Sequence, residues 1–129
     1  MPIGVLYGVP RRVARTNHFQ KLVLDDLPAA IAGIQELGIT PGHVTMLVPG
    51  DLVSQGLGQE LIFFIEALFQ KKGRTPAVRA KLAAAVKLRL ADYTLRHLPD
   101  CRTVEVIIRL HRRGDGYDIW RKGEPSPPR

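Results

Sequence analysis

Residues 61–75, LIFFIEALFQKKGRT, decide the fold of this chain, because they join a long apolar run to a tight basic turn. The apolar run predicts a buried β-strand over about 60–69. Thr75 is a favoured helix N-cap and Pro76 suits the first helical position, so we expect a helix from there to about Leu98. Apolar residues recur along one face of this helix: Val78, Leu82, Val86, Leu90 and Tyr93.

The first half of the chain repeats this order of strand, helix and strand. We predict its strands over 3–9 and 43–48, and the last strand of the second half over 103–110. Three pairs of segments agree in pattern at a shift of 59 or 60 positions: 3–9 with 62–68, 14–16 with 73–75, and 44–48 with 104–108. The chain is therefore predicted to be an internal duplication of one β-α-β unit.

The helix of the first unit is predicted over about 18–37. Four apolar residues fall there at helical spacing: Leu24, Leu27, Ile31 and Ile34. Pro28 interrupts the pattern, so the helix either bends at Pro28 or has its regular part beginning near Asp26. Gly38 is a suitable C-terminal stop for this helix.

Two such units predict an α+β fold with two layers. Each unit needs a right-handed crossover between parallel strands, which gives a four-stranded sheet with both helices on one face. We expect one domain over 1–124, with units at about 2–50 and 60–110, a C-terminal hairpin at 111–124 and a loose tail at 125–129. The other sheet face is apolar and must be covered, and copies of the same chain are the simplest cover.

Composition excludes several kinds of site and location. Cys101 is the only cysteine, so neither an internal disulfide nor a cysteine zinc site can form within one chain. The four histidines lack metal-ligand spacing, and we expect neither a metal nor a cofactor. No apolar run approaches the roughly 18 residues of a membrane span, and no secretory-signal pattern is present. We therefore expect a cytoplasmic protein without membrane contact.

The net charge of +7 suggests an anionic partner, either nucleic acid or a small anionic substrate, and the alternative is a solvated surface that happens to be basic. Nucleic acid is not favoured, because aromatic residues make up 6% of the chain and do not alternate with basic ones. A serine triad is not favoured either, since the two serines, Ser54 and Ser126, fall in a predicted loop and in the tail. A small anionic substrate fits the composition better.

The start of the chain, Met1-Pro2, offers a candidate base. Methionine is normally trimmed when proline follows it, which leaves Pro2 with a free secondary amine. An apolar pocket and nearby arginines both disfavour the protonated amine, so such an amine could accept a proton near neutral pH. The alternative is that Pro2 is an ordinary start residue with no chemical role.

These features together resemble the tautomerase superfamily. The resemblance rests on Pro2 at the head of an apolar strand, on the duplicated unit and on the GRT turn at 73–75, which is similar to the Gly-Arg-Ser/Thr turn of 4-oxalocrotonate tautomerase. The stretch TVEVIIRLHRRGDGYDIW, 103–120, is similar to that family's second strand and C-terminal hairpin. The length matches the two-unit members around 5-carboxymethyl-2-hydroxymuconate isomerase and macrophage migration inhibitory factor, or an uncharacterised branch beside them.

The resemblance, which covers about 2–120, implies a homotrimer whose sheets form a barrel. It also implies that Pro2 is the general base, that Arg74 and Arg15 hold a substrate carboxylate, and that Tyr117 forms an aromatic wall. One departure is that Thr45 and Glu105 stand where the family has an arginine near the start of the second strand.

Two functions follow as hypotheses. The first is a tautomerase or isomerase that moves a proton on a small 2-oxo or unsaturated carboxylic acid, with Pro2 as base. The second is a catalytically silent homotrimer of the same fold that acts as a binding protein. Retention of Met1 in the mature chain argues for the second, because it converts the Pro2 nitrogen into an amide.

Overall fold

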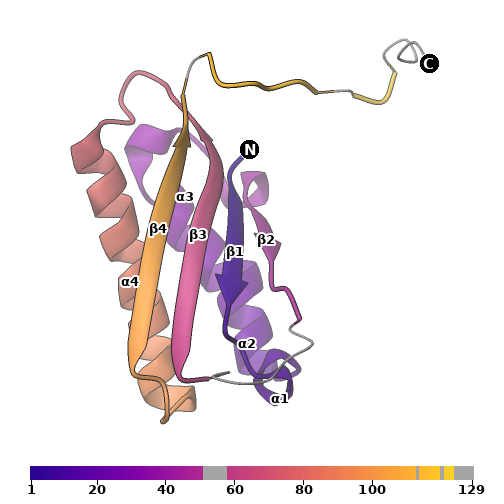
Figure 1. Ribbon diagram of the computed structural model, residues 1–129, viewed down its shortest axis with the longest axis vertical. Helices are drawn as coiled ribbons and strands as arrows, with labels where there is room; N and C mark the ends of the chain where they lie inside the picture. Colours follow the sequence, from indigo (N-terminus) through magenta and orange to yellow (C-terminus); the bar gives the residue numbers. More distant parts are fainter. Residues whose placement is uncertain (51–57, 113, 120, 124–129) are drawn as a thin grey trace.

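The computed structural model describes residues 1–50, 58–112, 114–119 and 121–123. Its four strands form one mixed sheet in the order β2-β1-β3-β4. The strands are β1 (Ile3–Tyr7), β2 (Thr45–Leu47), β3 (Glu60–Phe69) and β4 (Thr103–His111). The helices of both halves cover the same face of this sheet, as Figure 1 shows. The predicted two-layer α+β fold is confirmed.

The two halves meet through an antiparallel pair of strands. β1 is parallel to β2 and β3 is parallel to β4, as the duplicated unit requires, whereas β1 and β3 run in opposite directions. The two units are therefore related by a half-turn within the sheet. Turns that correspond in sequence consequently lie at opposite ends of the molecule.

The first helical segment begins close to its predicted start and ends earlier than its sequence pattern predicts. After α1 (Arg11–Ala14), the segment runs through α2 (Asn17–Lys21), a π-helical turn η1 (Leu22–Asp26) and α3 (Leu27–Ala32). The Leu27 N–H bonds to the Leu22 carbonyl, one residue farther back than in an α-helix. This wider turn lets the chain pass into Pro28, which has no N–H to donate, without ending the helix. The regular helix α3 begins at Leu27, directly after Asp26, so the predicted start of the regular part near Asp26 is confirmed, although helical turns already precede it from Asn17.

The chain after α3 forms short 3₁₀ turns. They are η2 (Gln35–Leu37) and η3 (Pro41–His43), which leads directly into β2. Gly38 ends η2 in the left-handed conformation, with φ of 64°, which glycine adopts without steric cost. The stop expected at Gly38 therefore belongs to η2 rather than to the main helix.

The second helix follows its prediction closely. α4 (Pro76–His97) begins after Thr75, whose side chain accepts a hydrogen bond from the Val78 N–H at 3.3 Å. Its buried stripe packs against the sheet and α3, and comprises Leu82, Val86, Leu90 and Tyr93. The sheet contributes the fully buried Leu6, Leu61, Phe63, Ile65 and Leu68 to the same core. Leu24, by contrast, is 65% exposed on the outer side of the first helical segment.

No helix of the described residues covers the other face of the sheet. Apolar side chains on this open face alternate with the buried ones along each strand: Ile3, Val5, Tyr7, Leu47, Ile62, Phe64 and Ile107. Phe64 lies at its centre, with the Tyr7 ring 5.7 Å away and the Arg109 guanidinium 4.5 Å from its ring. The open face is therefore apolar around Phe64 and polar toward its margins, where Thr45, Glu66 and Glu105 lie.

The chain after β4 extends away from the sheet (Figure 1). The described residues between 112 and 123 form turns and no strand, and the hairpin expected over 111–124 stays a prediction, because part of that range lies outside the described residues. Trp120 and the predicted tail at 125–129 lie outside the described residues. Within the described part of the chain, no helix is both long enough and apolar enough to cross a membrane.

Candidate active site

Pro2 is buried where β1 begins. The N–H of Thr45 at the start of β2 donates to the Pro2 carbonyl at 3.1 Å, and the next residue, Ile3, pairs with Glu66 of β3. Met1, in contrast, is 62% exposed. The nitrogen of Pro2 thus lies where three strands meet, and the exposed Met1 lines the same cavity as Pro2.

A backbone irregularity lies beside Pro2. The register between β3 and β4 shifts between Ile65 and Leu68, and Ala67 in this bulge has φ of 55°. Among the described residues, Ala67 is the only non-glycine with a positive φ. Such conformations cost of order 1–3 kcal/mol and cluster at functional sites. Ala67 in this bulge lines the same cavity as Pro2.

Arg74 is buried, with only 7% of its surface exposed. Its Nη1 donates to the Phe69 carbonyl at 2.9 Å and its Nη2 to the Leu37 carbonyl at 3.0 Å. Burial lowers the pKa of the Arg74 guanidinium from its usual value, although a guanidinium stays protonated at neutral pH. Two of its five N–H groups therefore tie β3 to η2.

One cavity contains both Pro2 and Arg74. Its volume is about 240 Å³, and Ile39, Phe69 and the Ala67 bulge give it apolar walls. Lys71 and His43 also line it, and none of the described lining residues is acidic. A pocket with two cations, no carboxylate and apolar walls suits a small organic anion.

The sequence did not single out Lys71 or His43 for this cavity. Lys71 begins the turn that carries Arg74, whose N–H bonds to the Lys71 carbonyl at 3.1 Å. The sequence signal that could have identified Lys71 was its position three residues before Arg74 in the same tight turn. His43 offered no comparable signal, because its place depends on the pairing of β2 with β1.

Arg15 and Tyr117 do not line this cavity. Arg15 is exposed after α1, at the far end of β1 from Pro2, because the two units lie antiparallel (Figure 1). Tyr117 is 58% exposed and stacks edge-on against Phe69, with ring centroids 4.7 Å apart. It lines a neighbouring cavity of about 220 Å³ that shares Phe69 with the first. Within one chain, Tyr117 is therefore next to the site and Arg15 is remote from it.

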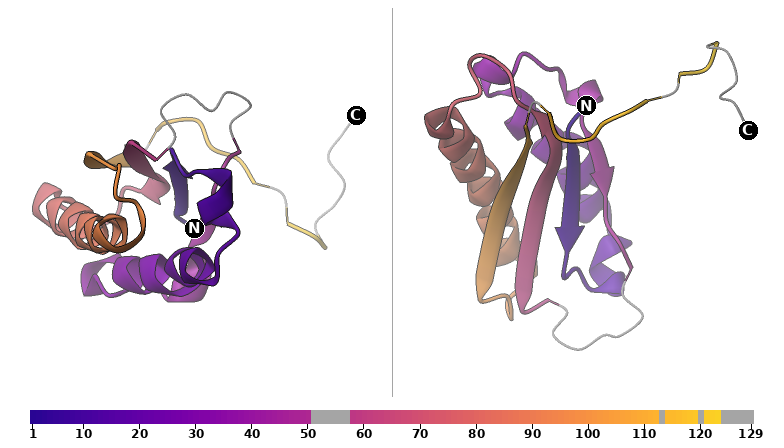
Figure 2. Two further views of the ribbon diagram at one scale, coloured as in Figure 1. Left: turned by 90° about the horizontal axis from the view of Figure 1, so that it is seen from below. Right: turned by 45° about the horizontal axis from the view of Figure 1, so that its top comes forward.

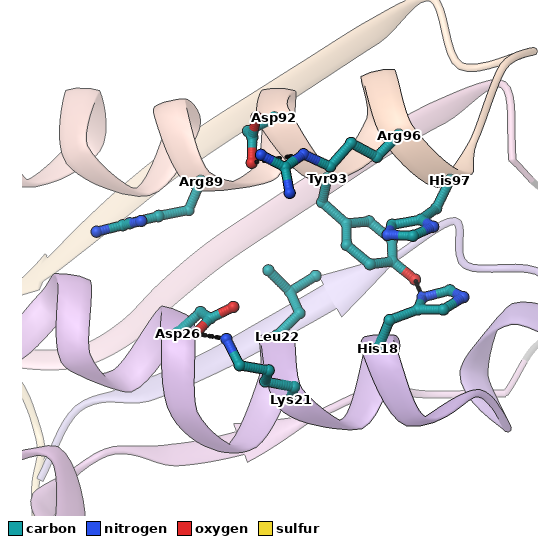
Figure 3. Close-up of a pocket in the computed structure, with 9 residues that line it drawn as sticks. All are labelled: His18, Lys21, Leu22, Asp26, Arg89, Asp92, Tyr93, Arg96 and His97. Atoms are coloured by element: carbon teal, nitrogen blue, oxygen red, sulfur yellow. Dashed lines mark hydrogen bonds and ion pairs between the residues drawn. The ribbon is translucent and has the colours of Figure 1, made fainter.

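A second group of ionisable side chains lies between α2 and α4 on the helical side, and Figure 3 shows it. His18 stacks on His97 with ring centroids 3.8 Å apart, and His18 Nδ1 lies 2.7 Å from the Tyr93 hydroxyl. Burial raises the pKa of Tyr93. Partial burial lowers the pKa of His97, and the charges of His18 and Arg96 act in the same direction.

This second pocket fits a binding role less well. Two of its cations already face carboxylates, Lys21 with Asp26 at 3.1 Å and Arg96 with Asp92 at 3.4 Å. The charges around the cavity of about 170 Å³ therefore largely cancel. In the described part of the chain, no group of three or more histidine, cysteine or acidic residues is placed to hold a metal ion.

Known structures show the same arrangement of strands and helices. A fused 4-OT, titled as a wild-type asymmetric trimer, superposes with a TM-score of 0.62 at 18% identity, covering 95% of this chain and 94% of that one. Pt0534 inactivated by 2-oxo-3-pentynoate superposes with a TM-score of 0.59 at 16% identity, covering 94% and 92%. Macrophage migration inhibitory factor from Toxoplasma gondii superposes with a TM-score of 0.55 at 19% identity, covering 95% of this chain and 97% of that one.

The chain has the tautomerase fold. No protein-family model and no curated protein matches the chain. The fold that the resemblance implied is confirmed by structures of low sequence identity. In the tautomerase fold of this chain, the Pro2 cavity lies at the end of the sheet where β1 begins and β3 ends.

Proposed function

We propose that this protein is a tautomerase or isomerase of small 2-oxo or unsaturated carboxylic acids, with Pro2 as general base. The observation that carries the proposal is the shared cavity, in which buried Pro2 lies with Arg74 and Lys71 and without an acidic side chain. Loss of Met1 would open this cavity and free the Pro2 amine within it. Of the relatives in structure, Pt0534 is inactivated by a 2-oxo acid, which supports this substrate class.

The proposed reaction is a proton transfer. The neutral Pro2 nitrogen removes a proton from the carbon next to the substrate carbonyl, and the cationic side chains hold the substrate carboxylate. The apolar walls formed by Ile39 and Phe69 limit access of water and strengthen these charge interactions. The proton then returns to another position of the same molecule, so no cofactor is consumed.

The proposal includes a homotrimer. The open face centred on Phe64 gives a single chain an apolar surface that copies of the chain would cover. One fused 4-OT of the same fold is described as an asymmetric trimer and another as a symmetric trimer. Tyr117 and Arg15 could then reach the Pro2 cavity of a neighbouring copy. A cytoplasmic location is part of the same proposal.

The alternative is a binding protein without catalysis. Arg74 already donates hydrogen bonds to two backbone carbonyls, so fewer of its N–H groups can bind a substrate, which favours this alternative. Under this alternative Met1 stays in place and the Pro2 nitrogen is an amide.

The test combines intact mass with activity. We expect the purified protein to lack the mass of Met1 and to accelerate ketonisation of phenylenolpyruvate or 2-hydroxymuconate. Pro2→Ala, which replaces the secondary amine with a primary amine at the same position, should slow the reaction. Lys71→Ala should raise KM, whereas Lys72→Ala is the matched control, because Lys72 is exposed next to it but does not line the cavity. Retained Met1, or an unchanged rate with Pro2→Ala, contradicts the proposal.

A further inference from the structure

His43 has a fixed orientation at the edge of the Pro2 cavity. It is the last residue of η3, and its Nδ1 accepts a hydrogen bond from the Thr40 backbone N–H at 3.0 Å. The Thr40 hydroxyl lies 3.2 Å from the same nitrogen. These two contacts hold the ring from one side while its surface lines the cavity.

The Thr40 contact determines which ring nitrogen carries the proton. A backbone N–H can only donate, so Nδ1 must hold a lone pair and the proton of the neutral ring is on Nε2. Within the described residues, Nε2 of His43 makes no hydrogen bond to the protein. In this tautomer, His43 therefore presents an Nε2–H donor that has no partner among the described residues.

The turn that carries His43 lies beside the chain terminus. Thr45, two residues after His43, pairs with Ile3 and donates to the Pro2 carbonyl. Figures 1 and 2 show the short turn before β2 next to the end marked N. Strand pairing thus holds His43 and Pro2 at the same cavity, although 41 positions separate them in the sequence.

We propose that His43 donates a hydrogen bond from Nε2 to the substrate oxygen that becomes negatively charged during proton transfer. This inference rests on the proposed function of the Pro2 cavity. The C–H bond next to the carbonyl breaks and its proton passes to the Pro2 nitrogen. The electron pair forms a carbon–carbon double bond, and the carbonyl electrons move to oxygen, giving the enolate that Nε2–H binds. The proton on Pro2 is then returned to the substrate.

A neutral donor suits this step because the charge it stabilises exists only after the proton has moved. Such preorganised donors act mainly on the transition state and the intermediate. Lys71 and Arg74, which are charged throughout, are better placed to bind the carboxylate of the unreacted substrate. His43 would therefore influence kcat more than KM.

The first test is a binding comparison with oxalate, whose second carboxylate mimics the enolate oxygen of a 2-oxo acid, and with pyruvate, which mimics the unreacted substrate. By titration calorimetry, we expect His43→Leu to weaken oxalate binding about tenfold and to leave pyruvate binding within about twofold of wild type. His43→Asn, which keeps an N–H donor, should recover part of the oxalate affinity. His97→Leu makes the same chemical change in the distant pocket and should leave both affinities unchanged.

The second test is kinetic. In ketonisation assays, His43→Leu should lower kcat at least tenfold with little change in KM, and His43→Asn should recover part of the rate. Nitrogen-15 shifts of the His43 ring should show the Nε2–H tautomer. Equal oxalate affinity in wild type and His43→Leu, or no oxalate binding by wild type, overturns the inference. Oxalate binding that needs His43, in a protein without turnover, supports the donor and refutes the proposed function instead.

Discussion

Replacing Arg74 with methionine tests whether this buried arginine holds the fold as well as the site. Methionine keeps the apolar stem but removes both donors, so the Phe69 and Leu37 carbonyls lose their partners. A hydrogen bond from a charged donor contributes about 1.5–3 kcal/mol. We take the low end for each of the two bonds, because water can reach the vacated space through the cavity. The expected loss in free energy of unfolding is then about 3 kcal/mol.

This loss converts into a measurable change in melting temperature. A chain of 129 residues has an unfolding entropy of about 0.27 kcal/mol/K near 60 °C. Arg74→Met should therefore lower Tm by about 11 °C in calorimetry at one fixed protein concentration. The Tm of Arg74→Lys should lie between those of wild type and Arg74→Met, because one ammonium group cannot make both contacts of a planar guanidinium.

Lys72→Ala is the control for Arg74→Met, because Lys72 is exposed in the same turn. We expect its Tm within about 2 °C of wild type, as for most surface substitutions. A decrease in Tm smaller than about 4 °C for Arg74→Met would refute the reasoning, since it would mean that the two carbonyls find other hydrogen-bond partners at little cost. Such a result would indicate that Arg74 contributes little to stability and serves chiefly to bind a ligand.

Three further substitutions test other parts of the structure. The pKa of His97 is lowered in the folded chain, so the unfolded chain binds more protons below about pH 6.5, and the free energy of unfolding should decrease as the pH falls through this range. His97→Gln should therefore reduce the pH dependence of the urea midpoint, measured from pH 7.5 to 5.5. Ala67→Gly should raise the free energy of unfolding by about 1 kcal/mol in urea titration, because glycine adopts positive φ freely, and any destabilisation would contradict this. Phe64→Glu should turn the proposed assembly into folded monomers by light scattering with unchanged circular dichroism, and a persistent trimer would contradict the role of the open face.

The sequence predicted those elements whose signals are local. Thr75 and Pro76 mark the start of α4, and the spacing of its apolar residues identifies its buried face. The repeated order of strand, helix and strand predicted the two-layer sheet. The first helical segment was harder, because Pro28 normally ends a helix and the π-helical turn that accommodates it has no recognised local signature.

The candidate site was only partly predictable. Pro2 and Arg74 were chosen from the sequence, and the cavity does bring them together. His43 and Lys71 were not chosen, because solvent-exposed turn residues look alike until the strands that carry them are paired. Arg15 matches Arg74 in sequence but lies at the other end of β1.

The sequence by itself determined the repeated unit, its strands and its caps, because these depend on side-chain period and on neighbours a few residues away. Only the tertiary structure decided that the two units meet through antiparallel β1 and β3, a pairing of residues about 60 positions apart. That single pairing places the turn of the second unit, which carries Arg74, beside Pro2. It places the corresponding turn of the first unit, which carries Arg15, at the opposite end of β1. The duplicated chain therefore forms this Pro2 cavity at one end of the sheet, where long-range strand contacts rather than local pattern bring its residues together.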